Sequence, residues 1–438
     1  MSDSSKPAVL TGDHARDTAA QSPRDPTKWT RWRYRVFITT WILYASYYFC
    51  RKNFSVVMPM MARLDHYKTF DLAHLIFVFS LAYAAGQFVA GWLADRFGPR
   101  LVATCGGLLS AVCTAAMAVP ASHATLLILQ IGNGLGQGCG YSSCLKILGV
   151  WFARKERGTA TAWWGTSYIL GGSLATVFAT FAATNIFLAP GLGWRRGFLF
   201  PAFILAGGAL LFAWKVRSQP QDAGFPAIAE DETVQSGDAA WWTVATNPEV
   251  MILAGMYFFL KITRYSLLFW LPLYLVQRMQ YSEAWAGYTS SLFELVGFLG
   301  ALIAGYVSDR LMNARRYPVG ATMLFGLAGA LLIHPMIGRL GPVAMAASIS
   351  LLGILIYGPD VLMSATASID AVSPQQAARA VGIVNGIGSL GQLISAYVVA
   401  TIVDRFGWDQ LFVFFVVCSL AAGGLLTLRW NKGANDVR

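Results

Sequence analysis

Long apolar runs separated by short polar segments make up most of the chain after residue 30. Each run has roughly the twenty helical residues that are needed to cross a hydrocarbon core of about 30 Å. A longer polar segment divides the runs into two sets of six. We therefore expect an all-α membrane protein with twelve transmembrane helices in two six-helix bundles. The runs lie near residues 34–60, 72–94, 101–120, 124–151, 159–185 and 196–215, and near 250–276, 284–307, 319–338, 342–366, 376–402 and 409–429.

The polar segments predict the domain boundaries. Residues 1–30 form a polar, disordered tail without the apolar core of a signal peptide, and residues 431–438 form a second tail. The first bundle then occupies 31–215, a polar linker 216–249 and the second bundle 250–430. Lys and Arg are more frequent in the short loops on the side of the two termini. By the positive-inside rule, both termini are expected in the cytoplasm.

The first apolar run contains two charges well inside its length, Arg51 and Lys52. A charge near the middle of a bilayer costs about 2.5–3.5 kcal/mol on insertion scales, so it needs a partner. Tyr44, Tyr48 and Arg51 share one broad helical face, which is too polar to face lipid and predicts a cavity lining. We expect this cavity to bind an anion. Snorkelling of Arg51 to the membrane interface is the alternative that the pattern leaves open.

Composition excludes several classes of protein. With 56% hydrophobic residues, 13% charged residues and a mean hydropathy of +0.51, the chain is too apolar for a soluble protein, and the lipid bilayer is a necessary partner. The net charge of +11 does not indicate nucleic-acid binding, because the basic residues lie in short loops and at helix ends. The six cysteines lack metal-ligand spacing. We expect no metal, no cofactor and no enzymatic activity.

A short motif recurs at the same place in both sets of runs. Gly91-x-x-x-Asp95-Arg96 closes the second run, and Gly305-x-x-x-Asp309-Arg310 closes the eighth. Two parallel repeats around a central site imply alternating access. We interpret Asp95, Arg96, Asp309 and Arg310 as a cytoplasmic latch without ligand contact.

On this repeated motif the chain resembles the major facilitator superfamily over essentially residues 30–430. Further motifs resemble the organophosphate:phosphate antiporter family, which includes bacterial glycerol-3-phosphate and hexose-phosphate transporters and the glucose-6-phosphate translocases. The most specific motif is Tyr47-Tyr48-x-x-Arg51-Lys52-Asn53-Phe54. The others are Gly136-Gln137-Gly138-Cys139-Gly140-Tyr141, Trp151-Phe-Ala-Arg-Lys-Glu156-Arg157-Gly158, Arg264-Tyr265-x-x-x-Trp270-x-Pro272-x-Tyr274 and Ile356-Tyr357-Gly358-Pro359.

The resemblance implies a phosphate site made by two arginines, one from each bundle, which match Arg51 and Arg264. It also implies an ion pair between helices, Lys52 with Glu294, which is either a gate or a static pair. The implied function is exchange of an organic phosphate ester of the sugar-phosphate, glycerol-phosphate or phosphoglycerate class for inorganic phosphate. The implied location is the inner membrane of a bacterial cell.

Other side chains are expected near the same cavity. Lys261 lies three residues before Arg264, on the same helical face, and either contacts the anion or pairs with a carboxylate such as Asp360. Lys146 either reaches the ligand or approaches the cytoplasmic end. Hydroxyl groups of Tyr44, Tyr48, Tyr265 and Tyr357 either bind phosphate oxygens or pack between helices.

The chain departs from the family pattern at three positions. Gln87 stands where a Lys is common, Tyr168 where the glycerol-phosphate and hexose-phosphate carriers have a His, and Phe269 where some members have an Asp. The organic part of the substrate therefore stays undetermined. We nevertheless include Gln87 and Tyr168 among the expected cavity residues.

Two other functions are compatible with the sequence. The first is a proton-coupled symporter of another organic anion, with Glu294 or Asp360 as proton carrier. The second is a transporter-like sensor of external sugar phosphate, whose partner would be a histidine kinase. The sequence does not determine the oligomeric state, and a monomer is compatible with it.

Overall fold

The computed structural model describes residues 26–226, 241–373 and 376–431, and in these residues it contains helices and no strands. The expected tails at 1–25 and 432–438 and the middle of the expected linker, 227–240, lie outside the described residues. The first half consists of α1 (Pro26–Leu64), α2 (Thr69–Phe97), α3 (Pro99–Ala116), α4 (His123–Trp151), α5 (Arg154–Thr184), η1 (Pro190–Arg195) and α6 (Arg196–Lys215).

The rest of the chain begins with two short segments and continues with the second half. The segments are η2 (Pro220–Ala223) and α7 (Trp241–Ala245), so the expected linker is partly helical. The second half consists of α8 (Pro248–Gln277), α9 (Glu283–Leu295), α10 (Gly297–Tyr306), η3 (Val307–Leu311), α11 (Arg316–Ile337), η4 (Gly338–Leu340), α12 (Pro342–Val361), η5 (Leu362–Ala367), α13 (Ser368–Asp370), α14 (Ala377–Phe406) and α15 (Trp408–Thr427).

The apolar runs and the helices agree closely, with three physical differences. The first helix begins at Pro26, so its cationic first turns precede the apolar run. The eighth run is built from α9, α10 and the π-helical η3, and the tenth from α12, the π-helical η5 and α13. Inserted π turns of this kind follow no hydrophobic period, so apolar patterning cannot locate them.

Ten helices of the described chain are long and apolar enough to cross a membrane. The long helices α1 and α4 are not among these ten. Charges in α1 and polar side chains of α4, including Gln130, Asn133 and Gln137, lower their hydropathy. Gln130, Asn133 and Gln137 are buried, so α4 brings polar groups into the interior of the first half.

Polar caps and glycines fix the helix ends and spacings. The hydroxyl group of Ser122 accepts a hydrogen bond from the amide of Thr125 at the start of α4, and Ser282 caps α9 in the same way through Trp285. Glycines bring α2 and α4 into backbone contact, because a Cβ atom at Gly138 would lie 2.6 Å from the carbonyl carbon of Gly86. The two helices therefore form one rigid pair.

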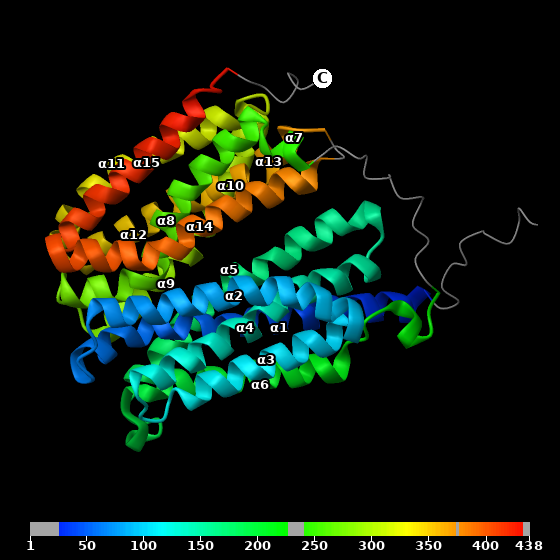
Figure 1. Ribbon diagram of the computed structural model, residues 1–438, viewed down its shortest axis with the longest axis horizontal. Coiled ribbons are helices and arrows are strands. Elements are labelled where there is room, and N and C mark those ends of the chain that lie inside the picture. Colours follow the sequence, from blue (N-terminus) through cyan, green and yellow to red (C-terminus); the bar gives the residue numbers. More distant parts are fainter. Residues whose placement is uncertain (1–25, 227–240, 374–375, 432–438) are drawn as a thin grey trace, which may run out of the picture.

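The two halves meet at the end of the molecule where α1 ends and α2, α4 and α9 begin, which we call the closed end. Arg63 of α1 forms an ion pair of 2.8 Å with Glu283 of α9, and the ring of Tyr397 on α14 packs against His74 of α2. Toward the end that carries the start of α1 and the end of α15, the two halves diverge (Figure 1).

Candidate functional site

Arg51 lies midway along α1 and is held by an amide and two aromatic rings. Its Nε and Nη2 atoms donate to Oε1 of Gln137 at 3.1 and 3.0 Å. Its guanidinium carbon lies 4.7 Å from the ring centre of Tyr48 and 4.5 Å from that of Tyr83. Gln137 is itself fixed, because its Nε2 donates to the carbonyl oxygen of Tyr47 at 2.9 Å. The sequence expectation that this face of α1 is polar and aromatic matches this geometry.

Arg264 lies midway along α8 in the other half and faces a carboxylate. Its Nη1 atom is 2.8 Å from each oxygen of Asp360 on α12, and its guanidinium carbon lies 4.6 Å from the ring centre of Tyr357. The side chains of Arg264 and Asp360 are 11% and 7% exposed. The Nε atom of Arg264 is buried, and no described residue accepts a hydrogen bond from it. A buried donor of this kind needs an acceptor.

An ion pair joins the two halves beside the arginines. Nζ of Lys52 on α1 is 3.1 Å from Oε2 of Glu294 on α9, and both side chains are at most 5% exposed. The hydroxyl group of Tyr357 lies 3.4 Å from the other oxygen of Glu294. Gly172 of α5 leaves the space for this carboxylate, because a Cβ atom there would lie 2.8 Å from its oxygens. A continuous set of polar contacts therefore runs from Lys52 through Glu294, Tyr357 and Arg264 to Asp360.

Lys261 and Tyr265 extend the site along α8. Nζ of Lys261 donates to Oγ of Ser389 on α14 at 3.2 Å and lies 4.8 Å from the ring centre of Tyr257. Asp360 instead forms its hydrogen bonds with Arg264, although it lies within electrostatic range of Lys261. The guanidinium carbon of Arg264 lies 5.4 Å from the ring centre of Tyr265. Tyr265 therefore lies beside the arginine of the second half.

The remaining expected cavity residues differ in their distance from the charges. Tyr44 is buried and stacks on Trp164 with ring centres 4.8 Å apart, which is a packing contact. Gln87 donates to the hydroxyl group of Tyr83 at 2.8 Å and so reaches Arg51 only through that ring. Tyr168 is partly buried on α5, among the hydrophobic residues of the first half.

The expected latch residues lie at the end where the two halves diverge, which we call the open end. The two acidic residues among them have their partners within their own halves. Asp95 pairs with Lys146 of α4, and Asp309 pairs with Arg316 of α11. Arg96 lies over the ring of Trp92, and Arg310 is exposed. Lys146 therefore lies near the expected cytoplasmic end and pairs with Asp95. This is one of the two positions that the sequence left open for it.

Sequence reasoning gave no role to Gln137 or Tyr83 and considered Asp360 only as a partner of Lys261 or a proton carrier. Gln137 carried a signal, because an amide among the glycines of an apolar helix must be buried with partners. The partners themselves depend on how α4 and α12 are rotated, which the sequence alone does not fix.

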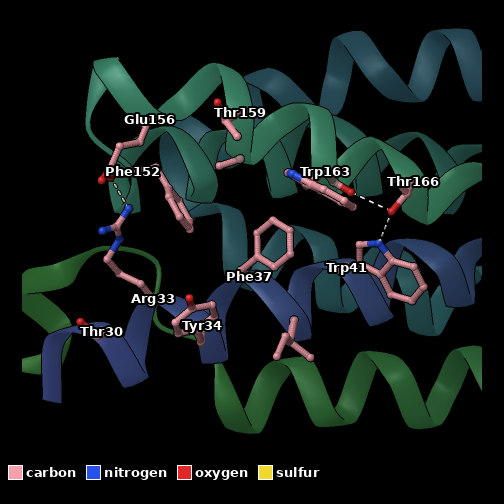
Figure 2. A pocket seen from close by; sticks show the side chains of 12 residues that line it. Thr30, Arg33, Tyr34, Phe37, Trp41, Phe152, Glu156, Thr159, Trp163 and Thr166 are labelled. Atoms are coloured by element: carbon pink, nitrogen blue, oxygen red, sulfur yellow. Dashed lines mark hydrogen bonds and ion pairs between the residues drawn. The ribbon is translucent and has the colours of Figure 1, made fainter. Parts of the chain in front are cut away.

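A large hollow of about 850 Å³ lies elsewhere, between the first turns of α1 and α5. Figure 2 shows its aromatic lining, with Trp41 and Trp163 at one end and the ion pair of Arg33 with Glu156 at the other. It contains neither Arg51 nor Arg264. Aromatic and charged side chains at helix ends are typical of the membrane interface, so this hollow is not the anion site.

The charges near the two arginines do not cancel. Arg51, Lys52, Lys261 and Arg264 face two carboxylates, Glu294 and Asp360, which leaves an excess of two positive charges. An anion with two negative charges would balance this excess. Guanidinium groups bind tetrahedral oxyanions through two parallel hydrogen bonds, which an ammonium group cannot form.

Comparison with known proteins gives relatives along nearly the whole chain. The glycerol-3-phosphate transporter of Bacillus subtilis is 28% identical over 421 residues, which are 92% of this chain and 93% of that protein. The membrane sensor protein UhpC of Escherichia coli is 28% identical over 408 residues, which are 90% of each chain. A solved bacterial homolog of the human lysosomal transporter Spinster superposes with a TM-score of 0.73 at 17% identity, over 91% of this chain and 96% of that one.

The similarity of fold and the family match agree with the repeated motif at Asp95 and Asp309. Residues 40–368 match the family model of the Major Facilitator Superfamily, which covers most of the chain. The chain therefore belongs to the Major Facilitator Superfamily.

Proposed function

We propose that this protein exchanges an organic phosphate ester for inorganic phosphate across the bacterial inner membrane. The observation that carries this proposal is the pair of partly buried arginines, Arg51 from one half and Arg264 from the other, beside the ion pair of Lys52 with Glu294 that joins the halves. The unpaired Nε of Arg264 and the positive excess around it suit a divalent oxyanion. Relatives named as glycerol-3-phosphate and hexose phosphate transport proteins support the same substrate class.

The topology belongs to the same proposal. Twelve membrane spans result if α1 and α4 cross the membrane together with the ten more apolar helices. With both termini in the cytoplasm, the closed end faces outward and the diverging end faces inward. The conformation is then inward-open, and phosphate would enter the site from the cytoplasm.

The proposed exchange follows from competition between carboxylate and phosphate. In the conformation described, Asp360 neutralises Arg264, while Gln137 orients Arg51. An arriving dianion takes the donors of both arginines and bridges the halves, which favours the return of the loaded carrier. Without an anion, the excess of two positive charges in the site would have to be enclosed uncompensated in a medium of low dielectric constant. Return of the empty carrier is therefore slow, and transport becomes exchange.

Substitution of the arginines tests this proposal. Arg51→Lys and Arg264→Lys keep the charge but lose the fork of parallel donors, so each should lower phosphate–phosphate exchange at least about a hundredfold. The assay is uptake of labelled phosphate by proteoliposomes preloaded with phosphate. Arg31→Lys, at an exposed position near the start of α1, is the control with an expected wild-type rate. Wild-type exchange in both site variants would exclude this anion site.

A sensor is the second candidate, because the relative UhpC is named a membrane sensor and is as similar as the transporter. A sensor would bind sugar phosphate through the same arginines without exchanging it. Measurement of binding and of exchange on one preparation separates the two functions. Uptake driven by a pH gradient in vesicles without internal phosphate would instead indicate the proton symporter.

A further inference from the structure

Three potential metal ligands gather at the closed end, far from the two arginines. Asp71 and His74 lie one turn apart at the start of α2, and His123 is the first residue of α4. One ligand atom from each of the three lies within 4.8 Å of those of the other two. The ring centres of His74 and His123 are 6.1 Å apart.

The helices that carry these residues are rigidly placed. Asp71 caps α2, because its Oδ2 accepts a hydrogen bond from the amide of Lys68 at 3.0 Å. Ser122 caps α4 immediately before His123. Since the glycines near Gly138 hold α2 and α4 in backbone contact, the three ligands keep their spacing without help from a mobile loop.

A second observation points to a ligand. The Nδ1 atom of His123 is buried, and no described residue forms a hydrogen bond with it. Rings of Tyr67 and Tyr397 surround the two imidazoles, at 5.8 Å from His123 and 5.6 Å from His74. A buried imidazole nitrogen without a partner is costly, and coordination of a metal ion would satisfy it.

We propose that Asp71, His74 and His123 bind one divalent transition-metal ion of the zinc class. Two imidazoles and one carboxylate are a ligand set that zinc and cobalt accept, whereas Mg²⁺ and Ca²⁺ prefer oxygen ligands only. Water completes the coordination. Ligand atoms around a tetrahedral zinc ion lie about 3.5 Å apart. The three ligand atoms now lie within 4.8 Å of one another, so small rotations of the side chains bring them to that distance.

All three ligands belong to the first half, and this separates the metal site from the anion site. None of the three ligands comes from the second half or from the anion site, although the ring of Tyr397 on α14 packs against His74. The outcome of a metal-binding experiment is therefore independent of whether the proposed exchange is correct. The pattern of the sequence could not reveal the site, because His123 is far from Asp71 along the chain and only the packing of α2 on α4 joins them.

Binding of Co²⁺ and Zn²⁺ to the full-length purified protein tests the site. The protein is treated with a chelator after removal of any histidine tag, and Co²⁺ is added while the visible d–d absorption is recorded. We expect saturation at one Co²⁺ per chain. Added Zn²⁺ should displace Co²⁺, so the absorption should disappear.

Variants at the ligands decide the outcome. His74→Asn and His123→Asn should each weaken Co²⁺ binding at least tenfold, which corresponds to about 1.4 kcal/mol. His66→Asn, in the neighbouring loop, is the matched control, and Asn tolerates the positive φ of 57° found there. Gel filtration of each variant checks the fold. Absence of saturable binding, or full affinity in both ligand variants, would overturn the proposal.

Discussion

At the scale of the residue, the partner of Arg264 is the most informative contact of the candidate site. Family resemblance points to an acid on the helix of Arg264, and this chain has Phe269 there. The structure supplies an acid from another helix, since Asp360 of α12 holds the guanidinium group by two contacts of 2.8 Å. A negative charge is thus present next to Arg264 although position 269 carries no acid.

Replacement of this acid should separate binding from turnover. Asp360→Asn removes the internal competitor of phosphate, so we expect KM for inorganic phosphate to fall about tenfold, or about 1.4 kcal/mol. Turnover should fall as well, because the anion no longer has a carboxylate to displace it from Arg264. The measurement is the concentration dependence of phosphate exchange in proteoliposomes.

The control for this change is Asp309→Asn, which removes a carboxylate that is paired at the open end and 59% exposed. It should leave KM unchanged. A variant Asp360→Asn that loses folded protein but keeps the wild-type KM would show that the carboxylate has only a structural role.

At the scale of the element, apolar patterning predicted the helices well and their mutual contacts poorly. Apart from the start of α1, boundaries agree within a few residues, because the hydrocarbon thickness fixes how long an apolar helix must be. The contacts depend on helix rotation, which hydropathy does not encode. The partners of Arg51 and Arg264 could not be derived for this reason, whereas the Lys52–Glu294 pair came from family resemblance alone.

The α2–α4 contact gives a prediction about stability. A Cβ atom at position 138 would lie 2.6 Å from the carbonyl carbon of Gly86, and backbone atoms cannot move aside as a flexible side chain would. Gly138→Ala should therefore lower the free energy of unfolding by about 1–3 kcal/mol. Gly149→Ala on the same helix is the control, because the nearest atom to its Cβ is 4.0 Å away. Thermal unfolding in detergent measures both, and equal stability would contradict the close contact.

At the scale of the whole molecule, the contacts between the halves identify the part that must open. Arg63 with Glu283, His74 with Tyr397 and Lys52 with Glu294 all join the halves between the middle of the helices and the closed end. The sequence predicted two halves from its repeated motif. It could not predict which end is closed, because the same sequence must form both conformations of an alternating-access cycle.

A disulfide across the closed end tests whether this end must open during exchange. A Cβ atom at position 287 of α9 would lie 2.9 Å from Cβ of Thr180 on α5, so the two helices are near enough for a crosslink once they move slightly apart to the spacing of about 3.5–4.5 Å in disulfides. Thr180→Cys with Gly287→Cys should form a crosslink under mild oxidation, which abolishes exchange. A reductant should restore the exchange rate.

The single cysteine variants control for damage by the substitutions, and oxidation of the wild type controls for its six native cysteines. Phosphate binding measured from the open end should survive in the crosslinked protein, because Arg51 and Arg264 do not have to move for it. Loss of exchange with retained binding would place the outward-opening movement between α5 and α9. Undiminished exchange in a fully crosslinked sample would mean that the halves do not separate at this end.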